Sequence, residues 1–227
     1  MLQALPTPER LIDRTYQQLL DAIADGTLAP AQRIRQAELA DSLGISRQPV
    51  SHALHLLKRQ GLVEDHGKKG LRVVPIDPIK VMEFYQLRQA MDGLAASLAA
   101  QRVAAQTADK TLITALQSQL RTGKTYSAAT PIPTLVRADT DFHRTLYRLS
   151  GNTAMTETIA PIWPHLMRSM ASVLHLPAYA ERVWQQEHPA ILTAILAADP
   201  IRSETAARDH AAGAATRTAE HLQPQAA

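Results

Sequence analysis

The chain has 227 residues, of which 45% are hydrophobic and 20% are charged, and its formal net charge at pH 7 is +3. This length suffices for one large domain or two smaller ones that each bury a core. The sequence contains no cysteine, which excludes disulfide bonds and thiolate metal sites. The N-terminus lacks a secretory signal pattern, and no apolar run approaches the roughly 18 residues that a membrane span needs. We therefore expect a soluble, cytoplasmic protein with no membrane partner.

The first 60 residues predict three helices. Apolar side chains recur at helical spacing over residues 8–25, and a shorter helix is expected over 36–42. After a turn at Gly44, Ser46 is placed to cap a third helix over 46–60. This third helix is expected to bury one stripe of side chains, namely Val50, Ala53, Leu54 and Leu57.

A basic hairpin is expected after the third helix. Two β-prone runs, 62–64 and 71–74, flank the turn sequence HGKKG, and helix, helix-turn-helix and hairpin together predict a winged helix-turn-helix. Residues 47–72 contain six basic and two acidic side chains, a net charge of +4, whereas the rest of the chain sums to about −1. Such a local excess is typical of a surface that faces phosphate groups. Asp77–Pro78 marks the expected boundary, so the first domain spans 1–76.

The N-terminal turn of the third helix carries polar side chains, as a helix that reads base edges in the major groove requires. Arg47 is suited to guanine, Gln48 to adenine and Ser46 to a phosphate. The basic hairpin turn is suited to the minor groove or the backbone. The alternative is an ordinary helical hairpin with a solvated polar face. We expect DNA contacts from eight residues, which are Ser46, Arg47, Gln48, Ser51, His52, His66, Lys68 and Lys69.

The stretch ELADSLGISRQPVSHALHLLKRQGLVEDHGKKGLRV resembles the DNA-binding domain of the GntR superfamily, and the resemblance extends over about residues 10–76. It implies a homodimer in which two winged domains read a palindromic double-stranded operator. Two positions depart from the family pattern. Ala37 precedes ELA and Ser51 follows PV, where the family usually has arginines that contact the operator. We therefore expect an operator that differs from the usual family sequence.

The second domain, residues 77–227, is rich in alanine and is predicted to be an all-helical bundle of about six helices. Short connections between the helices favour a bundle, and the chain as a whole is expected to be mainly α. The helices are expected over residues 79–105, 108–123, 132–150, 153–173, 177–198 and 200–221.

Within this domain, RADTDFHRTLYRLSGN places a carboxylate and an imidazole on one helix face. Asp139 and His143 are four residues apart, so their side chains project from the same side. Such a pair is either half of a metal site or an ordinary helix-surface pair. His188 lies beside apolar positions and His210 lies among alanines. Taken alone, each of these two histidines is more typical of a hydrogen-bonded core residue than of a metal ligand.

Residues 79–221 resemble the FCD ligand-binding domain of the FadR subfamily, on the segments FYQLRQAMDGLAASLAA, DTDFHRTLYRLSGN, EHPAILTAILAAD and RDH. The resemblance implies a divalent metal ion, zinc or nickel above all, with manganese and iron as alternatives. Its ligands would be Asp139, His143, His188 and His210. Open coordination positions on such an ion suit a small carboxylate metabolite. Arg88 is expected either to bind this effector or to form a salt bridge to a neighbouring helix.

Together these features predict a homodimeric, metabolite-responsive transcription regulator, most simply a repressor. A metal-dependent hydrolase or lyase is the first alternative, because an open Asp/His₃ ion can activate water. The sequence has no HExxH-type base, nucleophile elbow or ExxH pair, so we expect no enzyme. The second alternative is a DNA-binding dimer without small-molecule control, whose DNA affinity would not respond to metal or acid.

Overall fold

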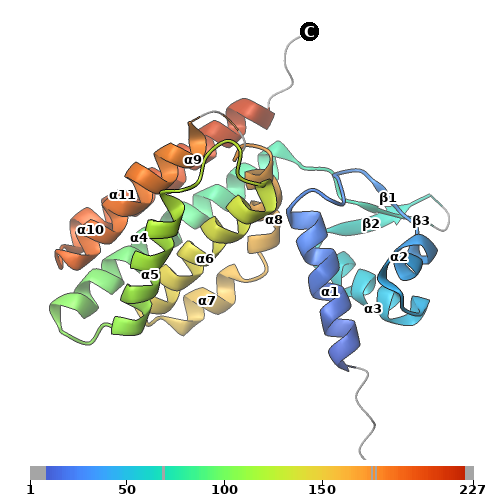
Figure 1. Ribbon diagram of the computed structural model, residues 1–227, viewed down its shortest axis with the longest axis horizontal. Coiled ribbons are helices and arrows are strands. Elements are labelled where there is room, and N and C mark those ends of the chain that lie inside the picture. Colours follow the sequence, from blue (N-terminus) through green and yellow to red (C-terminus); the bar gives the residue numbers. More distant parts are fainter. Residues whose placement is uncertain (1–8, 68–69, 175, 177, 223–227) are drawn as a thin grey trace, which may run out of the picture. The chain divides into compact units, whose positions relative to one another are not determined.

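The computed structural model describes residues 9–67, 70–174, 176 and 178–222 (Figure 1). The chain divides into two compact units, residues 1–76 and 77–227. The first unit is a small helical domain with a three-stranded antiparallel sheet, and the second is a helical bundle. The expected fold class, a winged helix-turn-helix followed by an all-helical bundle, is therefore confirmed.

The first unit places its sheet beside three helices. The strand order is β1-β3-β2, with Val63 opposite Val73 and Ile34 opposite Leu71. Its elements are α1 (Glu9–Ala24), β1 (Arg33–Ile34), α2 (Gln36–Leu43), α3 (Arg47–Arg59), β2 (Val63–His66) and β3 (Gly70–Val73).

The core of this unit forms between α1 and α3. The predicted stripe on α3 is confirmed, since Val50, Ala53, Leu54 and Leu57 are all buried. The turn between α2 and α3 uses Gly44 at φ +64°, and its N–H donates to the carbonyls of the preceding helical turn. α3 therefore has one face fixed in the core and the opposite face exposed.

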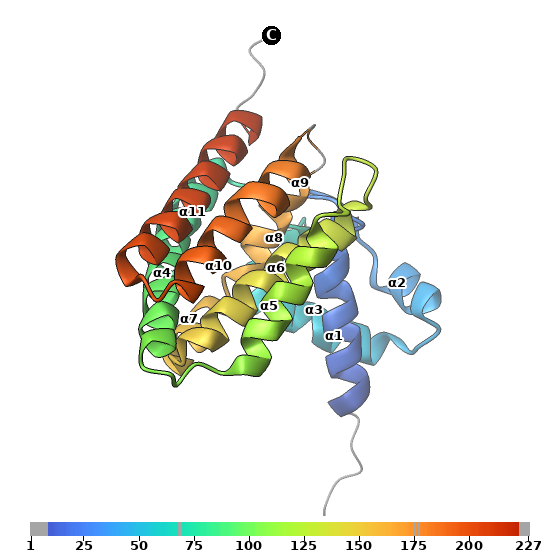
Figure 2. The same cartoon turned by 60° about the vertical axis from the view of Figure 1, so that its left-hand side comes forward.

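In the second unit, α4 contacts α6, α8, α10 and α11. Figures 1 and 2 both show α11 alongside α4. The two helices approach closely because small side chains lie between them, including Ala96 and Ala100 on α4 and Ala207, Ala211 and Ala214 on α11. The elements are α4 (Pro78–Ala104), α5 (Lys110–Gly123), α6 (Ile132–Ser150), α7 (Thr153–Ile159), α8 (Trp163–Ala171), α9 (Tyr179–Arg182), a π-helical turn (Val183–Glu187), α10 (His188–Leu196) and α11 (Pro200–Leu222).

Two helices that were predicted as continuous are interrupted, and prolines account for both interruptions. The expected helix over 153–173 is two helices, α7 and α8, because Pro161 has no N–H with which to continue the helical hydrogen bonds beyond Ala160. The expected helix over 177–198 contains the π-helical turn. Pro189 cannot donate a hydrogen bond and would clash with the carbonyl four residues earlier, which the wider π turn avoids.

The π turn places Trp184 in the core, where its indole ring lies against the end of α5. The ring is fully buried and leaves no room for a side chain at Gly123, because a Cβ atom there would overlap the indole. α5 and the π turn are thus held together by a contact that only glycine permits.

We predict that Gly123→Ala destabilises the bundle by about 1–3 kcal/mol, because the added methyl group must displace a buried ring. Thermal unfolding followed by tryptophan fluorescence measures this change. The matched control is Gly213→Ala in α11, whose Cβ would meet only the flexible end of Arg217 at 3.0 Å. Because alanine is the better helix former, the control should be neutral or slightly stabilising. Equal stability of both variants would contradict the packing argument.

Candidate metal centre

The fold brings four predicted side chains to one buried point. Asp139 and His143 come from α6, His188 begins α10, and His210 lies on the face of α11 that contacts α4. One ligand atom from each lies within 4.8 Å of the others, and all four residues are buried. Nε2 of His143 is 3.2 Å from Nε2 of His210. Nε2 of His188 is 3.4 Å from Oδ1 of Asp139.

His188 is fully buried, and both of its ring nitrogens lack a hydrogen-bond partner among the described residues. Its ring stacks on Phe142 at a centroid distance of 4.0 Å and meets the edge of Trp184 at 4.6 Å. Burial, followed by the positive charges of His210 and Arg88, lowers its pKa well below the ordinary value. A neutral imidazole is the form that binds metal ions. A buried polar atom without a partner is destabilising, so these nitrogens indicate a ligand site.

His143 is held so that Nε2 faces the cluster. Its Nε2 lies 2.6 Å from Nη2 of Arg88, and its Nδ1 lies 3.3 Å from Oδ2 of Asp92. A guanidinium group can only donate, so Nε2 accepts and the ring proton is on Nδ1, toward the carboxylate. Burial, followed by the charge of Arg88, lowers the pKa of His143 well below its ordinary value.

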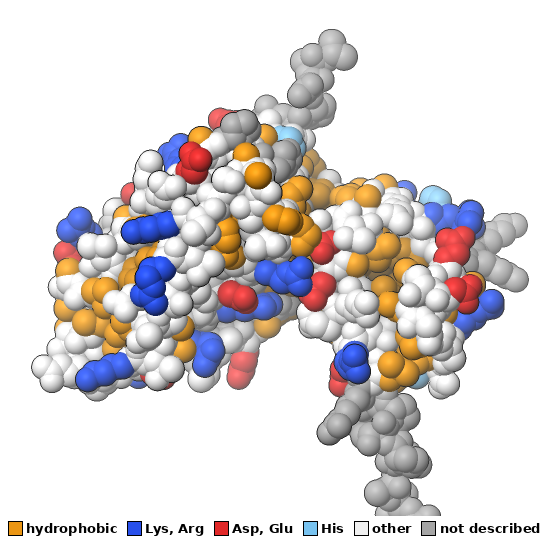
Figure 3. Space-filling model, in the orientation of Figure 1, with side chains coloured by type: hydrophobic (Ala, Val, Ile, Leu, Met, Phe, Trp, Pro, Cys, Tyr) orange, Lys and Arg blue, Asp and Glu red, His pale blue; other side chains and the backbone are white. Residues whose placement is uncertain are grey.

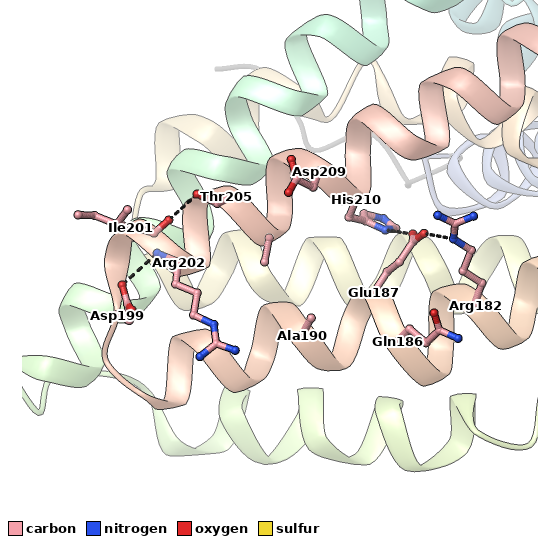
Figure 4. Close-up of a pocket in the computed structure, with 11 residues that line it drawn as sticks. Arg182, Gln186, Glu187, Ala190, Asp199, Ile201, Arg202, Thr205, Asp209 and His210 are labelled. Carbon is pink, nitrogen blue, oxygen red and sulfur yellow. Dashed lines mark hydrogen bonds and ion pairs between the residues drawn. The ribbon is translucent and has the colours of Figure 1, made fainter.

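His210 is oriented by Glu187, as Figure 4 shows. Its Nδ1 donates to Oε2 of Glu187 at 2.8 Å, so Nε2 is the ring nitrogen that faces the cluster. Glu187 also pairs with Arg217 at 3.0 Å and with Arg182 at 2.9 Å. Although burial favours the neutral acid, the hydrogen bond from His210 and the charges around it lower the pKa of Glu187 to about 2.

Arg88 lies at the cluster and joins it to a second buried carboxylate. Its Nε is 3.2 Å from Oδ2 of Asp92, and its Nη2 is 3.6 Å from Oδ2 of Asp139. Tyr147 donates to Oδ1 of Asp92 at 2.6 Å. Burial opposes the guanidinium charge, but Asp92 and Asp139 outweigh it and raise the pKa of Arg88 above its ordinary value. Burial also raises the pKa of Asp139, against the effect of Arg88.

Three residues of this arrangement were not predicted, namely Asp92, Tyr147 and Glu187. The helical spacing of Arg88 and Asp92, four residues apart on α4, was a detectable signal for the first. Although the sequence has no HExxH-type base, Glu187 lies beside a histidine of the cluster, His210. With two arginine partners and a pKa of about 2, it is a fixed carboxylate and a poor general base.

A groove of about 780 Å³ runs between α10 and α11 and ends beside the cluster (Figure 4). Its walls carry Arg182 and Arg202 as well as Asp199 and Asp209. Glu187 lines it together with His210. The groove therefore reaches the carboxylate that orients His210.

The predicted DNA-reading residues lie on the exposed face of α3 and at the end of β2. Ser46, Arg47, Gln48, Ser51, His52 and His66 are all exposed, whereas Lys68 and Lys69 lie outside the described residues. Ser46 is the N-cap residue of α3, but its side chain makes no capping hydrogen bond.

Part of the basic excess on this unit is neutralised locally. Lys58 pairs with Asp65 and Arg72 pairs with Glu64, each at 2.7 Å. Figure 3 shows acidic side chains among the basic ones on the visible face of this unit. Arg47 makes no ion pair with any residue that the structure describes.

Comparison with known protein families shows which family the chain belongs to. Residues 11–73 match the family of bacterial regulatory proteins called gntR, and residues 83–213 match the FCD domain family. The chain belongs to the GntR family. It is a transcription regulator with an N-terminal GntR helix-turn-helix and a C-terminal FCD domain, and this family is not one of enzymes.

Individual proteins similar to this GntR regulator are also named as transcriptional regulators. It is 32% identical over 148 residues to the "Uncharacterized HTH-type transcriptional regulator YdhC" of Bacillus subtilis, over 65% of this chain and 63% of that protein. It is 27% identical to the "Probable D-xylose utilization operon transcriptional repressor" of Paenarthrobacter nicotinovorans, over 87% of this chain and 84% of that protein. The fold matches that of E. coli McbR/YncC with a TM-score of 0.76 at 17% identity, covering 94% of this chain and 95% of that one. None of the described helices combines the length and apolar character needed to cross a membrane.

We predict that Asp92→Ala destabilises the bundle by about 3–5 kcal/mol, because it leaves a buried guanidinium without its main partner. Tyr147→Phe removes only one hydrogen bond to the same carboxylate and should cost about 1 kcal/mol. Urea unfolding followed by tryptophan fluorescence reports on the bundle, since both tryptophans, Trp163 and Trp184, lie in it. A loss below about 1 kcal/mol for Asp92→Ala would show that the ion pair is not needed for stability.

Proposed function

We propose that this GntR regulator is a metabolite-responsive repressor whose bundle binds a divalent metal ion and, with it, a small carboxylate effector. The observation that carries the proposal is the convergence of Asp139, His143, His188 and His210 on one buried point. The two unpartnered ring nitrogens of His188 support a ligand there. An ion bound to these residues would offer open coordination positions to carboxylate oxygens.

The donor set fits a divalent ion of intermediate softness. Three imidazoles and one carboxylate favour zinc or nickel over magnesium or calcium, which prefer oxygen ligands. Glu187 supports this assignment, because a carboxylate hydrogen-bonded to the outer ring nitrogen commonly holds a histidine ligand in place, and Asp92 lies 3.3 Å from Nδ1 of His143. In this proposal Arg88 pairs with the acid group of the effector.

The DNA-binding role is assigned to the exposed face of α3 and to the hairpin. The unengaged hydroxyl of Ser46 is free to donate to a phosphate, and Arg47 is free to contact a guanine. The other proposed contacts are Gln48, Ser51, His52, His66, Lys68 and Lys69. Because Ala37 and Ser51 replace arginines that are usual in the family, we propose an operator that differs from the common one.

An exposed apolar stripe on α4 supports a homodimer. Leu87 and Leu94 lie seven residues apart, and their side chains are about half exposed, at 50% and 48%. In a two-fold antiparallel pairing, Leu87 of one copy would face Leu94 of the other, so the stripe is complementary to itself. We propose that a second copy of the chain covers it and that the dimer reads a palindromic operator.

Control of DNA binding requires that the effector bind one arrangement of the two winged units better than another. Repression is the simplest outcome, and the matched relative from Paenarthrobacter nicotinovorans is named as a repressor. A metal-dependent hydrolase is less well supported, because the carboxylate nearest a cluster histidine is held by arginines.

The proposal predicts that a small acid changes operator affinity only when the metal site is intact. Fluorescence anisotropy with an operator selected from random duplexes would be measured with zinc or nickel and a panel of di-, tri- and hydroxycarboxylic acids. At least one acid should weaken binding about 5–150-fold in wild type, the usual range of allosteric coupling. His188→Ala should bind the operator but not respond. A wild-type affinity that no acid changes would contradict effector control.

Arg47→Ala is expected to lose discrimination between the operator and random DNA by about 1–3 kcal/mol, because one base-reading contact is removed. Competition binding with operator and random duplexes measures this loss. Arg144→Ala is the matched control, since it removes the same charge from an exposed site on the bundle. Retained discrimination in Arg47→Ala would remove this arginine from the reading set.

Leu94→Arg is expected to produce a monomer, because the introduced positive charge would be buried against Leu87 of the other copy. Sedimentation velocity measures the mass. Arg144→Glu, a charge change at an exposed site on α6, is the control and should leave the dimer intact. A dimeric Leu94→Arg variant would place the interface elsewhere.

A further inference from the structure

The guanidinium group of Arg88 lies inside the candidate donor set. Its Nη2 atom is 2.6 Å from Nε2 of His143, 3.4 Å from Nε2 of His210 and 3.6 Å from Oδ2 of Asp139. These three contacts involve atoms of three of the four groups that would bind the metal ion. One nitrogen of the guanidinium is thus at the centre of the same cluster.

The position of Arg88 is supported from several sides. The side chain is 1% exposed, and Asp92 holds its Nε. The guanidinium carbon lies 5.7 Å from the centre of the Trp163 ring and 5.8 Å from that of Tyr85. Arginine stays protonated in proteins, so the cluster contains a permanent cation of its own.

The guanidinium and a metal ion require the same lone pairs. Nη2 of Arg88 can only donate, so Nε2 of His143, 2.6 Å away, is unprotonated and accepts from it. Nε2 of an imidazole has one lone pair, which either accepts a hydrogen bond or binds a metal. Arg88 and a metal ion therefore exclude each other at His143.

We propose that Arg88 is a built-in competitor of the metal ion. In the metal-free protein its guanidinium balances the charge of the donor set and donates to its lone pairs. When the ion binds, the guanidinium leaves the donor set and pairs with the carboxylate of the effector. This inference rests on the proposed metal site. It gives the protein a way to couple the two ligands, because the acid provides a partner for the cation that the ion displaces.

The first test compares the zinc affinity of metal-free, full-length wild type with that of Arg88→Met, by competition with a chelating dye. Methionine is neutral and fills similar space, so the variant should bind zinc at least about tenfold more tightly. Arg208→Met, at an exposed arginine on α11, is the matched control and should bind like wild type. Equal or weaker binding by Arg88→Met, with wild type binding zinc, overturns the competition and leaves the metal site standing. No zinc binding by either protein overturns both.

The second test needs no substitution at Arg88 and stays informative if Arg88→Met does not fold. In wild-type protein labelled with ¹⁵N, the hydrogen bond from Arg88 should shift the Nε2 resonance of His143 and slow the exchange of one guanidinium N–H. One equivalent of zinc should abolish that protection while His143 Nε2 moves to a metal-bound shift. A protected Arg88 N–H that persists in the zinc-bound protein overturns the proposal.

Discussion

A carboxylate that is removed from water must be paired with positive charge or hydrogen-bonded, and Asp139 imposes this requirement on the centre of the bundle. Burial raises its pKa, and Arg88 acts against that rise. Arg88 is in turn held by Asp92, and Asp92 by Tyr147. The helices α4 and α6 are therefore joined by a chain of buried polar contacts as well as by apolar packing. The proposed metal site fits this arrangement, since the cluster already gathers donor atoms around one positive charge.

The bundle and the winged unit differ in how their charged side chains are placed. At the centre of the bundle, Arg88, Asp92 and Asp139 are buried and paired, so substitutions there are expected to change the free energy of unfolding strongly. On the winged unit, the pair Lys58–Asp65 is exposed and the pair Arg72–Glu64 is half-buried, and such pairs near the surface contribute little to stability. They do reduce the local positive charge, and in the proposed function a small number of exposed side chains on α3 read the sequence. An unusual operator is consistent with Ala37 and Ser51 at positions where the family commonly has arginines.

Local sequence patterns predicted those parts of the fold that depend on local spacing. The buried stripe of α3 follows from its apolar periodicity, and the shared face of Asp139 and His143 follows from their separation of four residues. His188 and His210 were predicted to join them only through the resemblance to the FCD family, because their meeting depends on tertiary packing. The contact of Glu187 with His210, 23 residues apart, was missed for the same reason. The π turn was missed because a proline within a helical pattern does not specify whether the helix breaks, kinks or widens.

Metal content tests the central claim most directly. Full-length wild type, His143→Ala and the exposed-site control His55→Ala would be purified without affinity tags that bind metal and analysed by elemental mass spectrometry. The account predicts about one zinc, nickel or similar ion per chain in wild type and in the control, and loss of that ion from His143→Ala. Absence of metal from wild type, even after reconstitution with zinc and nickel, would contradict it and leave a DNA-binding regulator that recognises its effector by another chemistry.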